Sequence, residues 1–162
     1  MNTPELIVLI GLPGVGKSTW ISNYLKDKTE EYIIVSSDNY ITKWAEEKGG
    51  TYRDYFNEFV VAAGKKSRED FFKAVKDTKN IIIDYTNMTE KRRKMWLDNT
   101  KEYNRIAVVW SLSPQTHDAR IKSREEKEGY LKVPSFVMDQ MAKSYVAPSK
   151  KEGFDKIIYI KD

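Results

Sequence analysis

The segment at residues 11–18, with the sequence GLPGVGKS, constrains this chain more than any other feature. It matches G-x-x-x-x-G-K-[ST] at every fixed position and directly follows an apolar run at residues 6–10. Its glycines allow successive backbone N–H groups to point at one phosphate chain, provided that a buried strand precedes the turn and a helix follows it. The alternative, a glycine-rich turn with a chance lysine, leaves the coincidence of motif and strand unexplained. We therefore expect a strand, a phosphate-binding loop and a helix, in that order.

This loop predicts a site for a nucleoside triphosphate. The helix that follows it adds the positive end of its dipole to the phosphate site. Lys17 is expected to reach the β- and γ-phosphates, and the hydroxyl of Ser18 to hold Mg²⁺. The residues predicted to bind the nucleotide are Gly11, Pro13, Gly14, Val15, Gly16, Lys17, Ser18 and Thr19.

Length and composition limit the number of domains, the location and the kind of partner that we expect. A length of 162 residues suits one domain with a real core, so we expect a single domain over residues 1–162. The chain has no cysteine, which excludes disulfides and thiol catalysis and fits the reducing cytoplasm where we expect the protein. No apolar stretch approaches the roughly 18 residues of a membrane helix, so no membrane association is expected. The net charge of +4 mildly favours a nucleic acid partner, although many enzymes that bind only nucleotides are as basic.

The apolar pattern predicts an α/β fold. Five short runs are rich in Ile and Val without polar alternation, as expected of parallel strands that are covered on both faces; they span residues 5–10, 32–36, 80–84, 105–111 and 157–160. Helical patterns lie between them, at residues 52–63, 66–78, 88–103 and 135–145. We interpret the regular aromatic stripe of residues 52–63 as core rather than as a surface for stacking bases. Alternating strands and helices predict a three-layer α/β/α sandwich around a parallel five-stranded sheet.

Two carboxylates follow predicted strands, at the edge of the sheet where ligands bind in such folds. Asp38 follows the second strand and is a candidate general base for an alcohol acceptor; the alternative is that it caps a helix over residues 39–48. Asp84 ends the run IIID, which has the form of a Walker B element and is expected to hold Mg²⁺ with Ser18. The alternative for Asp84 is an aspartate that begins a turn.

An exposed helix is expected from residue 114 to residue 128, because it carries only two apolar side chains. We interpret residues 114–134 as a helical lid. Arg120 and Arg124 are four residues apart and share one face, so they are predicted to offset charge on a transferring phosphoryl group. The alternative is a ladder of ion pairs with the glutamates at 125, 126 and 128.

The stretch after the third strand allows two interpretations. Asn87 and Glu90 have the spacing of a capping box for the next helix. Arg92 and Arg93 lie on that helix beside two lysines, and four adjacent cations cannot share one face, so some of them are solvated.

Taken together, these motifs resemble the kinase domain of phage 5′-hydroxyl polynucleotide kinases. The resemblance covers residues 5–147 and is carried by GLPGVGKSTW, SDNY, IIIDYTNMTEKRR and an arginine-containing lid that ends in GYLKVP. It implies an adenylate-kinase-like P-loop kinase fold, ATP with Mg²⁺, and transfer of the γ-phosphate to the 5′-OH of DNA or RNA in repair or modification. For a phage protein it also implies the host cytoplasm.

Carried onto matching positions, the resemblance implies a role for individual residues. Lys17 and Ser18 serve the nucleotide, Asp38 is the general base and Arg124 is a lid arginine. Thr86 is implied as an acceptor contact, and from the same stretch we predict acceptor contacts at Asn87, Arg92 and Arg93.

The chain departs from the family pattern at three points. Ile41 stands where the family has an arginine for the acceptor's 3′-phosphate, and Glu128 stands at the usual lid arginine, so Arg120 is the candidate substitute. The D-x-D-G-T motif of a phosphatase domain is missing, so 3′-phosphatase activity is not expected. A hydroxymethylated base in DNA and a small nucleoside or alcohol metabolite therefore stay open as acceptors, as does a nucleotide-binding switch without acceptor. The sequence does not separate ATP from GTP and gives no oligomeric state.

Overall fold

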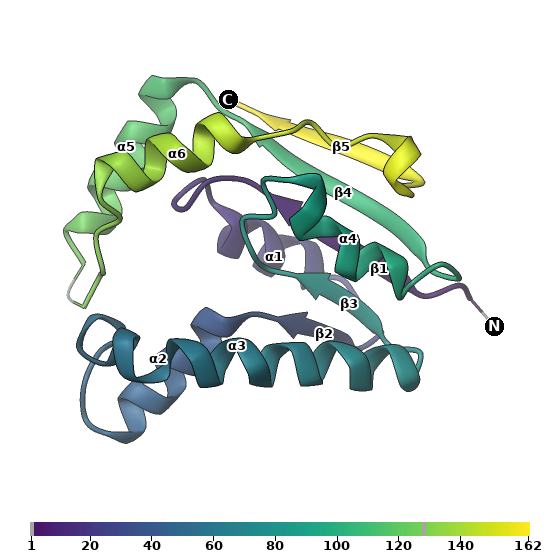
Figure 1. The fold of residues 1–162 in the computed structure, drawn as a ribbon, viewed down its shortest axis with the longest axis horizontal. Helices are drawn as coiled ribbons and strands as arrows, with labels where there is room; N and C mark the ends of the chain where they lie inside the picture. Colours follow the sequence, from purple (N-terminus) through teal and green to yellow (C-terminus); the bar gives the residue numbers. More distant parts are fainter. Residues whose placement is uncertain (1, 128) are drawn as a thin grey trace.

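A parallel sheet of five strands organises the computed structural model, which describes residues 2–127 and 129–162 (Figure 1). The strand order is β2-β3-β1-β4-β5, and every neighbouring pair is parallel. The strands are β1 (Glu5–Ile10), β2 (Tyr32–Val35), β3 (Asn80–Ile83), β4 (Asn104–Ser111) and β5 (Lys156–Lys161). The expected three-layer α/β/α sandwich with a parallel five-stranded sheet is therefore confirmed.

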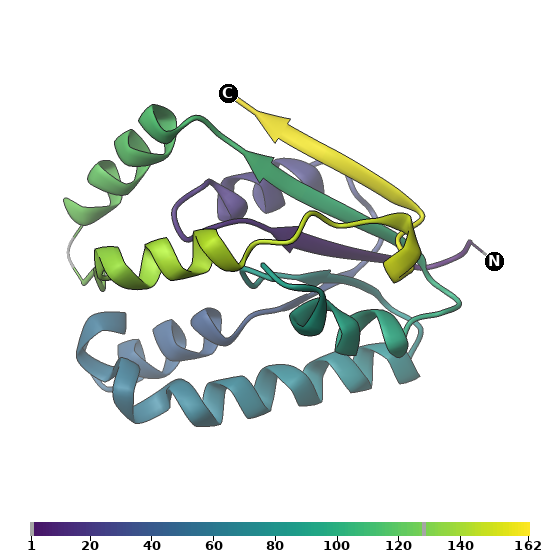
Figure 2. The same cartoon turned by 45° about the horizontal axis from the view of Figure 1, so that its top comes forward.

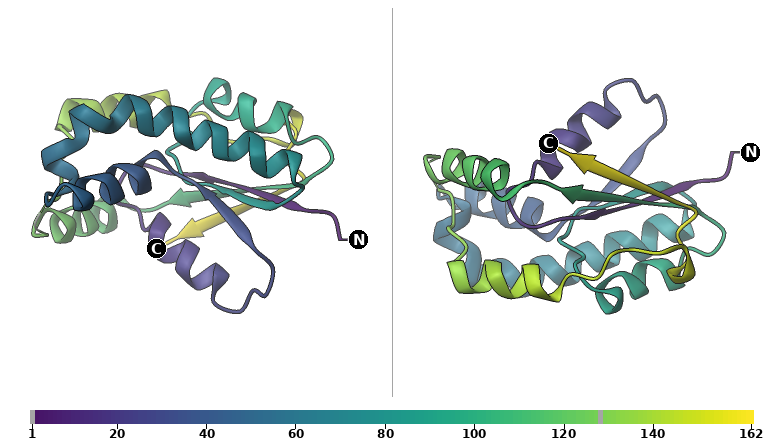
Figure 3. Two further views of the ribbon diagram at one scale, coloured as in Figure 1. Left: turned by 90° about the horizontal axis from the view of Figure 1, so that it is seen from below. Right: turned by 90° about the horizontal axis from the view of Figure 1, so that it is seen from above.

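Helices cover both faces of this sheet, with α1 on one face and α3 and α4 on the other (Figure 3). They are α1 (Lys17–Leu25), α2 (Ser37–Glu47), α3 (Tyr52–Lys76), α4 (Glu90–Asp98), α5 (Pro114–Glu125) and α6 (Ser135–Ser144), with a short 3₁₀ turn, η1 (Lys150–Glu152). Among the described residues, no helix combines the length and apolarity that crossing a bilayer requires.

The core explains why the strands show no polar alternation. Alternate residues of β1 point to opposite faces, so Leu6 and Val8 pack toward α3 and α4, whereas Ile7 and Leu9 pack toward α1. Both clusters are apolar, and β1 is almost fully buried. A strand buried on both faces therefore reads as a continuous apolar run.

The helical segments differ from the sequence pattern at two places. Residues 52–63 and 66–78 were expected as two helices, but α3 is continuous through Gly64. Its buried positions stay in phase across the glycine, from Ala63 to Ser67 and Phe71, and packing of this face offsets the roughly 1 kcal/mol that a helical glycine costs. Helix α4 is shorter than the expected 88–103 at both ends: the side chain of Thr89 caps its start by accepting from the N–H of Arg92, and the helix ends at Asp98. The capping box proposed for Asn87 and Glu90 is therefore wrong.

Asn87 instead links β1 to α4 from inside the protein. It is buried and has a φ of +49°, which asparagine tolerates better than most residues. Its Nδ2 donates to the carbonyl of Leu9 at 2.8 Å, and its Oδ1 accepts from the indole Nε1 of Trp96 at 3.0 Å. These bonds hold the segment after β3 against the end of β1.

Arg93 is the largest fully buried side chain among the residues that the structure describes. Its guanidinium donates to both carboxylate oxygens of Glu152, at 2.8 and 3.1 Å, and to the carbonyl of Asn87 at 3.0 Å. A buried guanidinium is stable only with such a set of acceptors. The predicted acceptor contacts at Asn87 and Arg93 are therefore not supported, since both side chains are used within the fold.

We predict that Arg93→Met lowers the free energy of unfolding by about 3–5 kcal/mol, because it leaves the carboxylate of Glu152 buried without its partner. Urea unfolding measures this change. Lys94→Met on the same helix is the matched control, since the salt bridge from Lys94 to Asp98 is exposed and its loss should have a much smaller effect. Equal losses for the two variants would contradict this account of Arg93.

Candidate active site

The loop between β1 and α1 lies at the carboxyl edge of the sheet, beside α5 and α6, and α2 begins at the same edge (Figures 1 and 2). The N-cap of α1 is Gly16, whose φ of +107° is in the left-handed region that a residue with a Cβ rarely adopts. Within the described chain no side chain caps this helix, so its first N–H groups face the loop. The geometry fits a phosphate chain bound at a helix N-terminus.

Lys17 is folded over this loop. Its Nζ donates to the carbonyl of Gly11 at 2.6 Å and to that of Leu12 at 3.3 Å. Burial lowers the pKa of Lys17 to about 8; the carboxylates of Asp84 and Asp38 act in the opposite direction, and Arg124 lowers the pKa further. All three charged groups are thus close enough to act on the ammonium.

Asp84 is the carboxylate that acts most strongly on Lys17. It follows β3 directly, and its N–H donates to the carbonyl of Val35 at 2.9 Å, which fixes the ends of β2 and β3 together. Burial raises the pKa of Asp84, while Lys17 works against that rise.

Asp38 lies in the first turn of α2, on the same edge of the sheet. The cap of α2 is Ser36, whose side chain accepts from the N–H of Asn39 at 3.3 Å, so the alternative that Asp38 caps this helix is wrong. Its exposed carboxylate instead accepts a hydrogen bond from the hydroxyl of Tyr52 at 2.8 Å. The side chain at position 38 is therefore free of a capping role, and its charge acts on Lys17 and Asp84.

The donor set beside Lys17 suits Mg²⁺. Ser18, on the first turn of α1, offers a hydroxyl oxygen and Asp84 a carboxylate, and both are the hard ligands that this ion prefers. Among the described residues, no cluster of three or more His, Cys, Asp or Glu side chains could hold a metal alone. Mg²⁺ usually takes only one or two carboxylates and completes its shell with phosphate oxygens and water. These residues therefore fit an ion bound together with a nucleotide, whose negative charge it would neutralise.

Helix α5 lies against the loop at three points. The ring Nε2 of His117 is 2.9 Å from the carbonyl of Pro13. The guanidinium of Arg120 donates to the carbonyl of Val15, and Ile121 fills the space that a Cβ on residue 14 would need. The loop is therefore covered by α5 in this structure.

The two arginines of α5 have different surroundings. Arg120 is held by the loop backbone, whereas the guanidinium of Arg124 lies 5.0 Å above the ring of Tyr130 and acts on the charges of Lys17 and Asp84. Glu125 pairs with Lys132 at 3.7 Å. Within the described part of the chain no ion pair joins a glutamate to either arginine, which does not support the ladder alternative.

The other predicted positions are spread around this centre. The carbonyl of Thr86 accepts from the N–H of Gly11 at 3.1 Å and so supports the loop, while Thr19 on α1 and Arg92 on α4 are exposed. Ile41 is fully buried in α2, so this position belongs to the core rather than to an acceptor site. Glu128 lies outside the described residues.

Sequence reasoning missed Tyr52 and Tyr130. Tyr52 is the first residue of the aromatic stripe on α3, and the regular spacing of that stripe predicts a core position for all of its members. Its position at the very start of the helix was the available signal, because a stripe that begins at the carboxyl edge of the sheet places its first member beside the site. Tyr130 carries no periodic signal at all.

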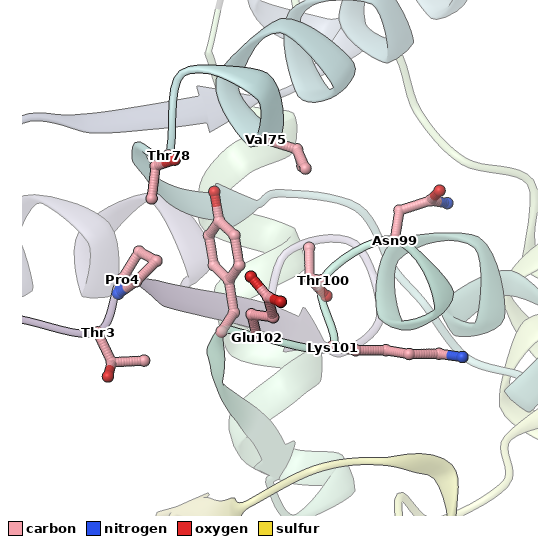
Figure 4. A pocket seen from close by; sticks show the side chains of 9 residues that line it. Thr3, Pro4, Val75, Thr78, Asn99, Thr100, Lys101 and Glu102 are labelled. Atoms are coloured by element: carbon pink, nitrogen blue, oxygen red, sulfur yellow. The ribbon is translucent and has the colours of Figure 1, made fainter.

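A cavity of about 650 Å³ lies between α5 and α6 and adjoins the phosphate-binding loop after β1. Its volume is within the roughly 300–1,000 Å³ typical of small-molecule sites. Its apolar lining includes Met88, Trp110, Leu112, Ile121, Val133 and Met138. A smaller hollow of about 260 Å³ lies at the amino ends of the strands, around Pro4, Thr78 and Thr100, at the edge of the sheet opposite the loop (Figure 4).

These features define a P-loop domain with the fold of P-loop kinases. A family model described as an AAA domain matches residues 6–148, and the chain belongs to this family.

Curated relatives match almost the whole chain. It is 28% identical to mouse heterogeneous nuclear ribonucleoprotein U-like protein 2, over 96% of this chain and 21% of the relative. It is 26% identical to the bifunctional polynucleotide phosphatase/kinase of Schizosaccharomyces pombe (94% and 32%) and 28% identical to the L-seryl-tRNA(Sec) kinase of Methanococcus maripaludis (93% and 56%). The chain thus spans between about a fifth and just over half of the length of these relatives.

Solved structures share the fold. The PezAT toxin–antitoxin structure of Streptococcus pneumoniae aligns with a TM-score of 0.71 at 19% identity, over 99% of this chain and 68% of that chain. The Pnkp1/Rnl/Hen1 RNA repair complex aligns with a TM-score of 0.66 at 20% identity, over 89% of this chain and 44% of that chain. At these identities the likeness concerns the fold.

We predict that nucleotide affinity falls as the pH rises above about 8. The pKa of Lys17 is lowered to about 8 in the ligand-free protein, and bound phosphates favour the charged ammonium. Above that pH, binding requires the uptake of a proton, so the dissociation constant should rise toward about tenfold per pH unit. Titration with a non-hydrolysable ATP analogue between about pH 7 and pH 9 tests this. Lys17→Met should bind more weakly with a flat profile, and a flat profile for the unmodified protein would contradict the prediction.

Proposed function

We propose that this protein is an ATP-dependent kinase that transfers the γ-phosphate to a hydroxyl group of a nucleic acid, with the 5′-OH of DNA or RNA as the acceptor that we favour. One observation carries the proposal: the exposed carboxylate of Asp38 lies in the same charged neighbourhood as Lys17, Asp84 and Arg124. A nucleotide-binding switch does not need an exposed carboxylate in that place, whereas an alcohol acceptor needs a group that takes its proton.

In this mechanism each charged residue has one task. Lys17 and the N–H groups at the start of α1 bind the phosphates, and Arg124 offsets charge that develops on the γ-phosphoryl group. Ser18 and Asp84 would hold Mg²⁺. The acceptor oxygen attacks the γ-phosphorus while its proton passes to Asp38, and the bond between that phosphorus and the β–γ bridging oxygen breaks to release ADP.

A lid function for residues 114–134 belongs to this proposal. Arg120 bonds to the backbone of the phosphate loop, so it would sense or fix the loop, while Arg124 is the arginine that we assign to the phosphates. Closure of α5 over the loop would keep water away from the γ-phosphate during transfer.

The sequence contains no motif that predicts where the nucleobase binds. We assign it to the apolar cavity between α5 and α6, because that cavity adjoins the loop and has the indole of Trp110 in its wall. An aromatic and aliphatic wall suits a flat base.

The comparisons support a nucleic acid acceptor. Two of the relatives are by name a polynucleotide phosphatase/kinase and a tRNA kinase, and one structural neighbour is part of an RNA repair complex. The net charge of +4 is compatible with such a polyanionic acceptor. Magnesium dependence, a cytoplasmic location and a phage source stay predictions.

Ile41 favours a second class of acceptor, one that is bound without a contact to a 3′-phosphate. The family pattern has an arginine there for the acceptor's 3′-phosphate, but Ile41 is buried and cannot take that role. A hydroxymethylated base or a small nucleoside or alcohol would not need that contact. A screen with radiolabelled ATP over 5′-OH DNA and RNA oligonucleotides, hydroxymethylated DNA and free nucleosides separates these acceptors, and a protein that only hydrolyses ATP slowly would indicate the switch.

We predict that Asp38→Asn lowers phosphate transfer by about 10²–10⁴-fold while ATP binding is retained, since the amide keeps the shape of the carboxylate but cannot take the proton. Transfer to the best acceptor of the screen and nucleotide titration measure the two effects. Asp70→Asn is the matched control, because Asp70 also accepts a tyrosine hydroxyl between α2 and α3 but does not act on Lys17. Undiminished transfer by Asp38→Asn would rule out its role as base.

A further inference from the structure

The hydroxyl of Tyr52 is bonded to the carboxylate that we assign as the base. Tyr52 is the first residue of α3 and donates to Oδ1 of Asp38 on α2 at 2.8 Å. Burial raises the pKa of Tyr52, and the negative charge of Asp38 raises it further, so the phenol remains a donor at physiological pH. The bond occupies one carboxylate oxygen and leaves Oδ2 to an acceptor hydroxyl.

The start of α3 is itself a rigid point. A capping box begins the helix, in which the side chain of Asp54 accepts from the N–H of Thr51 at 2.9 Å; the same carboxylate also accepts from the hydroxyl of Thr51 at 2.9 Å. Such a box satisfies backbone N–H groups that would otherwise lack a partner at the helix start, and so stabilises the first turn. The ring of Tyr52 therefore leaves the helix from a fixed backbone.

The turn that follows α5 contacts the start of α3. The N–H of Arg53 donates to the carbonyl of Gly129 at 3.2 Å. Gly129 is buried with a φ of +79°, and a Cβ there would lie 2.6 Å from the Cβ of Thr51, so only glycine fits this close approach. The next residue, Tyr130, lies beneath the guanidinium of Arg124.

We propose that Tyr52 is a positioning residue for Asp38, and that docking of the turn at Gly129 onto Thr51 and Arg53 holds Tyr52 in place. This inference rests on the proposed function and adds to it a link between the lid and the base. Because the same turn carries the partner of Arg124, one movement of the lid would place the arginine over the phosphates and fix the carboxylate for the acceptor.

The alternative is that the tyrosine bond merely joins two helices. The chain contains a matched case: the hydroxyl of Tyr40 donates to the carboxylate of Asp70 and also joins α2 to α3. A purely structural role predicts similar consequences for the loss of either hydroxyl. A positioning role predicts that only the loss at Tyr52 changes the chemical step.

The first experiment compares Tyr52→Phe with Tyr40→Phe in the full chain. With ATP and the best acceptor of the screen, Tyr52→Phe should lower kcat by about 10- to 100-fold, the value of one hydrogen bond to a charged group, with an unchanged KM for ATP. Tyr40→Phe should keep kcat within about twofold, whatever its effect on thermal unfolding. Equal kcat values for Tyr52→Phe and the unmodified protein would overturn the inference.

The same assay separates this inference from the proposed function. If the unmodified protein transfers phosphate to no alcohol, the proposed function fails and the inference fails with it. If the unmodified protein is active, Asp38→Asn is inactive and Tyr52→Phe is fully active, the proposed function stands and only the inference fails.

The second experiment tests the link to the lid. Gly129→Ala should undock the turn, and hydrogen exchange at the amide of Arg53 should accelerate, because an N–H in the first helical turn has no partner within its own helix. In that variant kcat should fall, and adding Tyr52→Phe should lower it little further. Unchanged exchange and kcat in Gly129→Ala, or an undiminished effect of Tyr52→Phe in that background, would show that the lid does not act through Tyr52.

Discussion

The burial of one ammonium group beside two carboxylates organises this molecule. Lys17 gives up part of its hydration and bonds to the carbonyls of its own loop, and Asp84 and Asp38 help to keep it charged. Perturbed charged groups of this kind are typical of functional sites, and here they lie beside a helix N-terminus that suits an anion. We assign that anion as the phosphate chain of a nucleotide. It would explain the positive φ of Gly16, the uncapped start of α1 and the position of α5 over the loop.

The parallel sheet makes this concentration of charge possible. All five strands end at one edge, so residues that follow β1, β2 and β3 meet there although they are far apart in the chain. Behind this edge lie buried polar contacts. They include the ion pair of Arg93 with Glu152 and the hydrogen bonds of Asn87. Arg93 and Glu152 are thus bonded to each other within the fold, whereas the charges around Lys17 lie at the carboxyl edge of the sheet.

The sequence predicted the elements whose signals are local. The apolar runs gave the five strands, because a strand covered on both faces has no polar alternation. The phosphate loop and the positions of Asp38 and Asp84 after their strands followed from motif and order. The acceptor contacts predicted for Asn87 and Arg93 are not supported, because a polar residue type can lie at the surface or in the core, and both of these side chains are buried and engaged within the fold. The prediction also divided α3 at a glycine that the packing of its buried face tolerates.

What the sequence by itself determined is the phosphate loop, the order of strands and helices, and the sheet that this order requires, since these depend on residues close together in the chain. Only the tertiary structure decided that Ser36 rather than Asp38 caps α2, and that Arg120 holds the loop while Arg124 acts on the charge of Lys17. It also decided that Tyr52 bonds to Asp38 and that Gly129 contacts the start of α3. The physical reason is that these contacts join residues from different elements. They form only when the sheet brings those elements to one edge, and no local pattern of side chains records them.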